Sequence, residues 1–327
     1  MLTEETHSLT VFAPASTGNL SVGFDALGLA LAPMDGTLLG DIVELSSGQG
    51  SDWALKVSGP FADALPYDPE QNIVLTCCRR FEDEARKHGA AIEPLSVHLN
   101  KRLPVGSGLG SSAASVVATL VGLNQYFDRP LNRLKMLALM AEMEGSISGG
   151  VHLDNIAPSL MGGLRLCVPG TSTQYALPWP SHWRAVVAWP GTQLNTREAR
   201  SVVPELVPRA TAVAQSARFA RFIHELHSGD ARHAAECLVD DIAEPFRAEL
   251  LPGFAQAREE LGEMGALAVG ISGSGPTLFS IVDDQRVAER ALTWLQAHYL
   301  QNERGFVHVC AADLEGARVV GRGPSSR

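Results

Sequence analysis

The sequence is short of basic residues, and this shortage excludes one broad class of function. Its 327 residues include 26 Lys and Arg against 36 Asp and Glu, which gives a formal net charge of −10. Because no stripe of basic side chains is available to displace phosphate counterions, we expect no nucleic-acid partner. A polyanionic ligand would have to be held locally, by backbone N–H groups, a helix N-terminus or a metal ion.

Long apolar runs and paired cysteines are also missing. Even residues 27–39 contain a proline and an aspartate, so they fall short of the roughly 18 uninterrupted apolar residues of a membrane helix. Residues 1–5 are acidic and lack the basic and apolar pattern of a secretory signal. The odd number of cysteines, five, favours reduced, buried thiols over a disulfide framework. We therefore expect a globular, cytoplasmic protein without a membrane partner.

The length indicates about two domains. The composition shifts to Gly, Pro, Ser and Thr between residues 161 and 181, and we place the domain boundary there. This division predicts an N-terminal domain of residues 1–170, a C-terminal domain of residues 171–320 and a disordered tail of residues 321–327. The first half mixes strands and helices and the second predicts helices layered on an antiparallel sheet, so the expected class is α+β.

Apolar periodicity predicts the individual elements. In the first half it predicts strands at residues 10–13, 41–45 and 95–100, a helix that ends near 126, and a second helix that begins near 128–130 and stops at Gly145. In the second half it predicts helices at 196–203, 209–226, 232–242 and 252–264, with strands at 185–189, 266–272 and 277–282. A final helix and strand follow.

The strongest chemical signal is a glycine-rich segment between a predicted strand and a predicted helix. It consists of Pro104, Val105, Gly106, Ser107, Gly108, Leu109, Gly110, Ser111, Ser112, Ala113 and Ala114. Alternate glycines let the backbone approach a ligand closely, and the following helix offers unpaired N–H groups to phosphates. The segment is neither a Walker A loop nor a dinucleotide fingerprint, because serine stands at positions 111 and 112. A serine-capped structural turn is the alternative, but the strand-to-helix context favours a phosphate-binding loop.

This segment resembles the ATP-binding motif of the GHMP small-molecule kinases. Residues 13–20 (Ala-Pro-Ala-Ser-Thr-Gly-Asn-Leu) and 270–277 (Gly-Ile-Ser-Gly-Ser-Gly-Pro-Thr) resemble the other two motifs of that family. Within the family, residues 19–25, 152–158 and 244–247 resemble homoserine kinases in particular. One departure is Thr17-Gly18, where those enzymes usually have a small pair ending in alanine, and we expect it to be tolerated.

The resemblance implies an N-terminal domain like the second domain of ribosomal protein S5 and a ferredoxin-like C-terminal domain. It implies ATP at their junction as co-substrate, Mg²⁺ as cofactor, L-homoserine as acceptor and a homodimeric assembly. The expected reaction is phosphorylation of the side-chain hydroxyl of L-homoserine. Another GHMP small-molecule kinase and a non-catalytic ligand sensor remain the alternatives.

The same resemblance implies residues for the acceptor. Homoserine presents an ammonium, a carboxylate and a hydroxyl, so its site needs an anion and guanidinium groups. Asp25 would pair with the ammonium, Arg200 and Arg247 would bind the carboxylate, and Asn19 with Asp154 would hold the hydroxyl. Arg197 stays open as the alternative to Arg200, and whether Asp154 accepts the proton stays open too.

The implied nucleotide and metal residues come from several segments. Ser112 and Glu144 would bind Mg²⁺, with Ser111 as the alternative serine. Thr196 would act near the γ-phosphate, although Asn195 and Glu198 predict a capped helix start there equally well. Asn72 would contact adenine, and residues 272–275 would pack against the phosphate loop.

Overall fold

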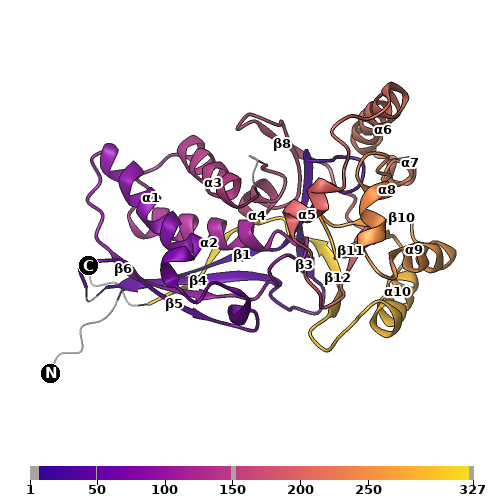
Figure 1. Ribbon diagram of the computed structural model, residues 1–327. Coiled ribbons are helices and arrows are strands. Elements are labelled where there is room, and N and C mark those ends of the chain that lie inside the picture. The colour runs from indigo at the N-terminus through magenta and orange to yellow at the C-terminus, as the bar shows by residue number, and fades with distance from the viewer. Residues whose placement is uncertain (1–6, 49, 149–151, 324–327) are drawn as a thin grey trace.

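A computed structural model describes residues 7–48, 50–148 and 152–323. Two groups of helices, each on its own sheet, lie side by side along the long axis of the molecule (Figure 1). The α+β class predicted from the sequence is confirmed. Within the described residues, no helix has the length and apolar character needed to cross a membrane.

The first sheet has five strands. Their spatial order is β13 (Arg318–Arg322), β1 (Ser8–Pro14), β4 (Gly40–Ser47), β6 (Leu95–Asn100) and β5 (Ala54–Ser58). Only β5 and β6 run parallel among these pairs of described strands. The predicted strands at 10–13, 41–45 and 95–100 are confirmed as β1, β4 and β6.

One buried helix organises this half. Helix α2 (Ser111–Tyr126) packs directly on β1 and β4 and is surrounded by α1 (Ile73–Lys87), α3 (Arg133–Ser148) and α4 (Ile156–Met161). Because α2 is enclosed on all sides, its sequence is apolar all round instead of amphipathic. Its N-terminus follows the glycine-rich segment directly, as predicted.

The second sheet is antiparallel and has eight strands. Along it lie β10 (Ala268–Ile271), β11 (Leu278–Val282), β9 (Arg184–Trp189), β12 (Phe306–Ala312), β3 (Leu27–Pro33), β7 (Leu164–Cys167) and β8 (Gln174–Leu177), with β2 (Ser16–Gly18) on β3. Its helices are α5 (Thr196–Ser201), α6 (Arg209–Ser228), α7 (Ala231–Glu236), α8 (Glu244–Arg247), α9 (Phe254–Glu263) and α10 (Gln285–His298). Three short 3₁₀ turns complete the described elements, at Ala62–Ala64, Pro69–Gln71 and Ala248–Leu250.

Strand β9 separates two hydrophobic cores. Ala185, Val187 and Trp189 join the core that continues into the first half, whereas Val186 and Ala188 face the core beneath α9 and α10. This two-residue alternation is the period of a strand buried on both faces. The predicted antiparallel sheet with helices layered on it is confirmed.

Three helix boundaries differ from the prediction by three residues or more. Helix α3 begins at Arg133, because Asp128 and Arg129 adopt positive φ and the Asn132 side chain caps the helix by accepting from Lys135 N at 3.1 Å. It continues past Gly145 to Ser148, since one glycine costs a helix only about 1 kcal/mol. Helix α7 ends at Glu236 and not at 242, because Asp240 Oδ1 accepts from the amides of residues 242 and 243 and starts α8.

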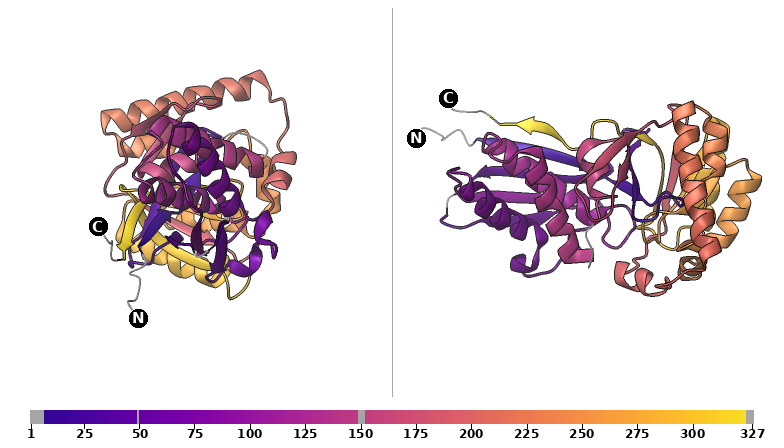
Figure 2. Two further views of the ribbon diagram at one scale, coloured as in Figure 1. Left: turned by 90° about the vertical axis from the view of Figure 1, so that its left-hand side faces the viewer. Right: turned by 90° about the horizontal axis from the view of Figure 1, so that it is seen from above.

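The first and last described strands, β1 and β13, lie side by side (Figure 2). Gly321 and Arg322, which we assigned to a disordered tail, belong to β13 because their backbones pair with Thr10 and Leu9 of β1. Residues 324–327 of that predicted tail lie outside the described residues. The segment 161–181 is not a plain linker, since it forms the β7–β8 pair and extends the second sheet.

Candidate active site

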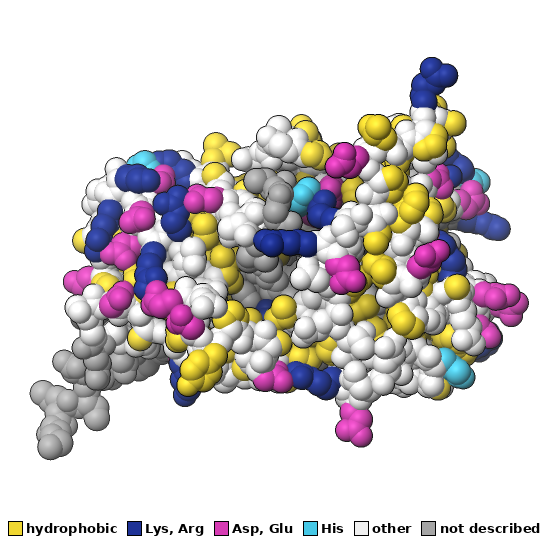
Figure 3. All heavy atoms as spheres, viewed as in Figure 1, with side chains coloured by type: hydrophobic (Ala, Val, Ile, Leu, Met, Phe, Trp, Pro, Cys, Tyr) yellow, Lys and Arg dark blue, Asp and Glu magenta, His cyan; other side chains and the backbone are white. Residues whose placement is uncertain are grey.

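A cavity of about 490 Å³ lies between the glycine-rich segment, residues 19–25 and helices α5 and α8. The centre of the face shown in Figure 3 is hollowed, with basic and His side chains at its edge. The sequence-predicted site residues that line the cavity are Asn19, Asp25, Asn72, Val105, Gly106, Ser107, Gly108, Gly110, Ser111, Ser112, Ala113, Glu144, Asp154, Thr196, Arg200 and Arg247. Pro104, Leu109 and Ala114 do not line it, and the latter two are buried in the core behind the loop.

The phosphate loop, residues 104–110, has a backbone that glycine makes possible. Gly106, Gly108 and Gly110 all adopt left-handed φ, of 63°, 81° and 64°. A Cβ on Gly108 would lie 2.3 Å from the carbonyl oxygen of Ser272. The Ser272 hydroxyl donates to Gly108 O at 2.7 Å, so residues 272–275 pack against the loop as predicted.

The two serines after the loop differ in orientation. Ser111 Oγ donates to Leu103 O at 3.2 Å and therefore faces the base of the loop. Ser112 Oγ donates to Glu144 Oε2 at 3.2 Å. Burial raises the pKa of Glu144, although the Ser112 hydrogen bond and the positive charge of Arg200 oppose this shift. Ser112 and Glu144 thus offer two oxygen groups side by side.

An ion pair also lines the cavity. Arg200 donates from both terminal nitrogens to Asp25, at 2.9 and 3.2 Å. His152 Nδ1 lies 3.6 Å from the same carboxylate, but burial lowers the His152 pKa and favours the neutral ring. Asp25 was expected to meet an ammonium and Arg200 a carboxylate, and in the free protein these two groups neutralise each other.

Arg247 lies behind this pair and is only 3% exposed. Its Nε donates to Ala199 O at 2.9 Å, one Nη donates to Gly273 O at 3.1 Å, and the guanidinium stacks over the Phe24 ring. Asn19 Nδ2 donates to the same Gly273 carbonyl at 2.9 Å. The Gly273 carbonyl therefore binds both Arg247, predicted to hold the acceptor's carboxylate, and Asn19, predicted to hold its hydroxyl.

The segment that carries Asn19 and Asp25 is strained. Asn19, Leu20, Ser21 and Asp25 all have φ between 44° and 68°, a region that side chains other than glycine rarely adopt. Asn19 Oδ1 accepts from Asp25 N at 2.9 Å and so holds the turn. Strain of this kind clusters at functional sites, where the surrounding structure enforces it.

Asp154 also lines the cavity and is 4% exposed. Burial raises its pKa to about 7, and the negative charges of Asp25 and Glu144 add to the effect. Gly18 makes room for this carboxylate, because a Cβ there would lie 2.4 Å from Asp154 Oδ2. An alanine at position 18 would clash with Asp154 where that side chain now lies, so the glycine at position 18 fits the position of Asp154.

Three predicted residues have structural partners of their own. Asn195 caps α5 by accepting from Arg197 N at 2.8 Å, which confirms the predicted cap, and Thr196 follows it with its hydroxyl 3.5 Å from Ser274 Oγ. Asn72 caps α1 by accepting from Val74 N at 3.0 Å. Arg197, the alternative to Arg200, also lines the cavity but is exposed.

Sequence reasoning missed several residues of the wall. Leu65, Pro66 and Ile73 supply apolar surface near Asn72, and no motif marks them. Asn155 accepts from Ser16 Oγ at 2.9 Å and donates to Asp154 Oδ2 at 3.2 Å. Lys101 also lines the cavity, and its position three residues before Pro104 could have marked it as a neighbour of the phosphate loop.

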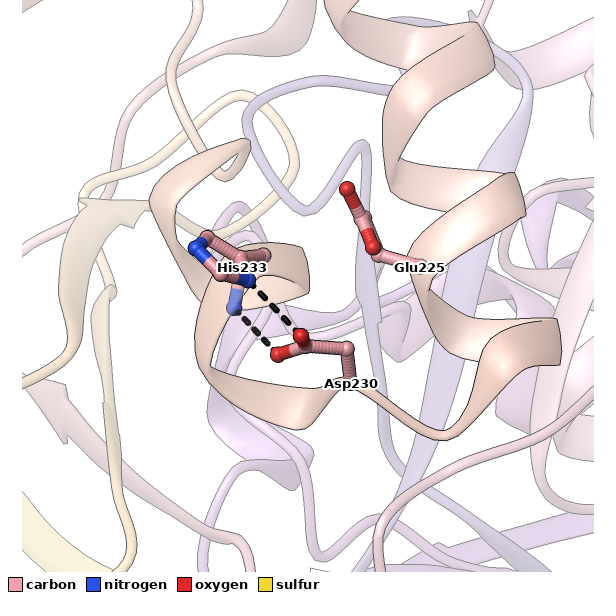
Figure 4. A group of neighbouring side chains, drawn as sticks. All are labelled: Glu225, Asp230 and His233. Carbon is pink, nitrogen blue, oxygen red and sulfur yellow. Dashed lines mark hydrogen bonds and ion pairs between the residues drawn. The ribbon is translucent and has the colours of Figure 1, made fainter.

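Another group of titratable side chains lies outside this cavity, where α6 meets α7 (Figure 4). Asp230 caps α7, with Oδ1 accepting from His233 N at 3.1 Å and Oδ2 lying 2.7 Å from His233 Nδ1. Glu225 accepts from Arg221 Nε at 3.2 Å. A helix cap and local ion pairs account for this cluster.

Comparison with known proteins agrees with this geometry. The family model for the N-terminal domain of GHMP kinases matches residues 72–163, and the model for their C-terminal domain matches residues 222–301. A homoserine kinase from Cytophaga hutchinsonii is similar in structure with a TM-score of 0.86 and 30% identity, over 96% of this chain and 97% of that one.

Two more distant structures share the fold. A mevalonate kinase has a TM-score of 0.68 and 12% identity, over 94% of this chain and 100% of that one. A mevalonate diphosphate decarboxylase from Staphylococcus aureus has a TM-score of 0.65 and 14% identity, over 97% and 99%. The two matched models, the 30% identity along nearly the whole chain and the phosphate loop at the cavity wall lead to one conclusion: the chain belongs to the GHMP kinase family of ATP-dependent small-molecule kinases.

Proposed function

We propose that this kinase transfers the γ-phosphoryl group of Mg-ATP to the side-chain hydroxyl of L-homoserine. The observation that carries the proposal is the charge pattern of the residues that line the cavity. Asp25 faces Arg200 there, with Arg247 behind them, and this arrangement suits a ligand that has both an ammonium and a carboxylate. The likeness to the Cytophaga hutchinsonii homoserine kinase supports the same acceptor.

In the free protein Asp25 and Arg200 are paired with each other, and a zwitterionic acceptor could replace each partner of this pair. The acceptor's ammonium would replace Arg200 at Asp25, and its carboxylate would replace Asp25 at Arg200. Each protein charge thus keeps a partner of opposite sign, which avoids the large cost of leaving a charge unpaired in a desolvated site. A neutral sugar or alcohol could not make this exchange, so the pair disfavours acceptors without both charges.

The donor set at Ser112 and Glu144 fits Mg²⁺. A hydroxyl and a carboxylate are the hard oxygen ligands that this ion prefers, and a cation would offset the burial of Glu144. When bound, the ion would neutralise charge on the β- and γ-phosphates. The glycine loop would hold the phosphates through backbone N–H groups at the start of α2.

In the proposed step the acceptor hydroxyl oxygen bonds to the γ-phosphorus, and the bond from that phosphorus to the β,γ-bridging oxygen breaks, releasing ADP. Asp154 lines the same cavity, where it would orient the hydroxyl and could receive its proton. A pKa near 7 leaves a large ionised fraction available at neutral pH. We assign the hydroxyl to Asn19 and Asp154, and the γ-phosphate end to Thr196.

The first experiment measures ADP release with Mg-ATP and five acceptors: L-homoserine, L-threonine, L-serine, mevalonate and galactose. We expect selective turnover of L-homoserine. Turnover of mevalonate or galactose would agree with the family assignment but contradict the assignment of L-homoserine as acceptor. ATP binding without any turnover would favour a ligand sensor.

The metal assignment predicts a specific defect in Glu144→Gln. This substitution keeps the shape of the side chain and removes its charge, so the Mg²⁺ concentration for half-maximal rate should rise about tenfold, equivalent to about 1.4 kcal/mol. The homoserine Michaelis constant should change little. Glu142→Gln is the matched control, because Glu142 is on the same helix but exposed and paired with Arg80. An unchanged Mg²⁺ requirement in Glu144→Gln would remove Glu144 from the metal site.

A further inference from the structure

A buried ion pair lies directly beneath the phosphate loop, and the proposed reaction makes no use of it. Lys101 is 1% exposed and Asp41 is fully buried. The Lys101 ammonium donates to Asp41 Oδ2 at 2.5 Å, to Ser111 O at 2.9 Å and to Ser115 Oγ at 2.9 Å. All three of its donors are therefore occupied by protein groups.

Asp41 completes the network. Its Oδ1 accepts from the backbone amides of Arg102 and Leu103, at 2.9 and 3.0 Å. Its Oδ2 accepts from Ser115 Oγ at 2.6 Å as well as from Lys101. The pair thereby joins three parts of the chain: the start of β4, the residues that enter the phosphate loop and the first turns of α2. Both ends of the loop are fixed to one point.

The pair also has an orientation. Lys101 lines the cavity and Asp41 does not, so Lys101 is the member of the pair that lies nearer the site. The other charged residues that line the cavity are Asp25, Glu144 and Asp154 and the three arginines Arg197, Arg200 and Arg247, in a protein of net charge −10. Arg200 is paired with Asp25 and Arg247 is bound to backbone carbonyls, and the proposed function assigns both to the acceptor. A bound polyphosphate therefore needs a local positive field, and a charge held in a water-poor environment acts more strongly than an exposed one.

We propose that Lys101 is a positioning residue for the nucleotide polyphosphate: it anchors both ends of the phosphate loop and holds a positive charge beneath it. Asp41 makes this possible by keeping the buried ammonium paired. The proposal rests on the nucleotide site of the proposed function. It assigns Lys101 no contact with the acceptor.

The test compares ATP, ADP and adenosine binding by calorimetry in variants of the full chain. Lys101→Met alone leaves Asp41 buried without its counter-ion, so the decisive variant is the double substitution Asp41→Asn with Lys101→Met. The introduced asparagine retains an oxygen for the amides of Arg102 and Leu103, and no buried charge remains. Ser115→Ala is the milder variant, since it removes one hydrogen bond from each member of the pair.

We expect the double variant to unfold at nearly the wild-type temperature and to bind ATP at least about tenfold more weakly, with adenosine affinity within about twofold of wild type. Ser115→Ala should shift ATP affinity in the same direction by less. Lys56→Met is the matched control, because it removes a lysine on β5, away from the cavity, and should leave all three affinities unchanged.

Two results would overturn the proposal. Wild-type ATP affinity in the double variant would show that the positive charge is not needed. Equal weakening of ATP and adenosine would show a general structural defect instead of a phosphate-specific one. If the wild-type chain itself failed to bind ATP, the proposed function would fail first, and this outcome is distinguishable from both.

Discussion

Replacing Arg247 by alanine should lower kcat/KM for L-homoserine by roughly 30-fold to several thousandfold, with little change in ATP affinity. That range corresponds to the loss of about 2 to 5 kcal/mol for one partner of a buried, hydrogen-bonded charge pair. Arg247 is held by Ala199 O and Gly273 O and stacked on Phe24, so its position is fixed before any ligand arrives. Steady-state kinetics with each substrate varied in turn, together with ATP titration, would measure the effect.

Two further variants separate charge from geometry. Arg247→Lys keeps the charge but loses the planar fork, and we expect it to recover only part of the loss. Arg197→Ala is the matched control. Arg197 lines the same cavity but is exposed, and the proposed function assigns it no contact with the acceptor. Wild-type homoserine kinetics in Arg247→Ala would contradict the assignment of Arg247 to the acceptor. A large defect in Arg197→Ala would show that Arg197, and not Arg200, binds the acceptor carboxylate.

Replacing Asp154 by asparagine should lower kcat by about 10²-fold or more, the usual size of a contribution from a positioned acid or base. The wild-type enzyme should lose kcat/KM as the pH falls through about 7, because protonated Asp154 cannot accept the hydroxyl proton. The variant should lack this dependence. A pH profile of both proteins with saturating Mg-ATP measures the two effects together.

The same substitution should stabilise the fold. The folded-state pKa of Asp154 is about 7, above its ordinary value of 3.8, so folding disfavours the ionised form. The contribution of Asp154 to stability is therefore greatest below about pH 4, decreases as the pH rises from about 4 to 7, and stays at its lower level above that. Asp154→Asn removes this loss, which a pKa difference of this size sets at up to about 4 kcal/mol.

Thermal unfolding at pH 5 and pH 8 tests the sign. The stabilisation by Asp154→Asn should be larger at pH 8 than at pH 5, whereas Asp283→Asn, an exposed carboxylate, should show no such difference. An equal shift at both values would contradict the raised pKa. A more stable but nearly inactive variant would show that Asp154 is kept for chemistry at the expense of stability.

Much of the fold follows from local patterns in the sequence. Strands β1, β4 and β6 and helix α2 were found from the spacing of their apolar residues. Strands β3, β7 and β8 were missed: the four-residue strands β7 and β8 are flanked by glycines and prolines, and β3 is apolar on both faces and has no alternation. The domain boundary at residue 170 and the homodimer stay predictions.

The site residues that belong to sequence motifs could be predicted. Gly106, Gly108 and Gly110 were predicted to let the backbone approach a ligand, and all three adopt left-handed φ beside the cavity. Predicted site residues from several distant segments do meet at this one cavity. Sequence patterns could not show that Asp25 and Arg200 pair, or that Ser111 turns away while Ser112 meets Glu144. These features depend on side-chain direction and on residues brought together from far along the chain, which spacing does not encode.

The pairing of β3 with β12 bears on how the enzyme emerges from the ribosome. Residues 15–25 hold Asn19 and Asp25, and the strand that follows them joins Leu31 to Ala312 and Ala32 to Ala311. A growing chain that has reached Gly275 possesses every residue we assign to the site, yet it lacks the strand on one side of β3. Such long-range pairing forms late in folding. Synthesis of the last sixth of the protein is therefore what completes the acceptor site, and a prematurely terminated chain should carry the phosphate loop without the power to phosphorylate.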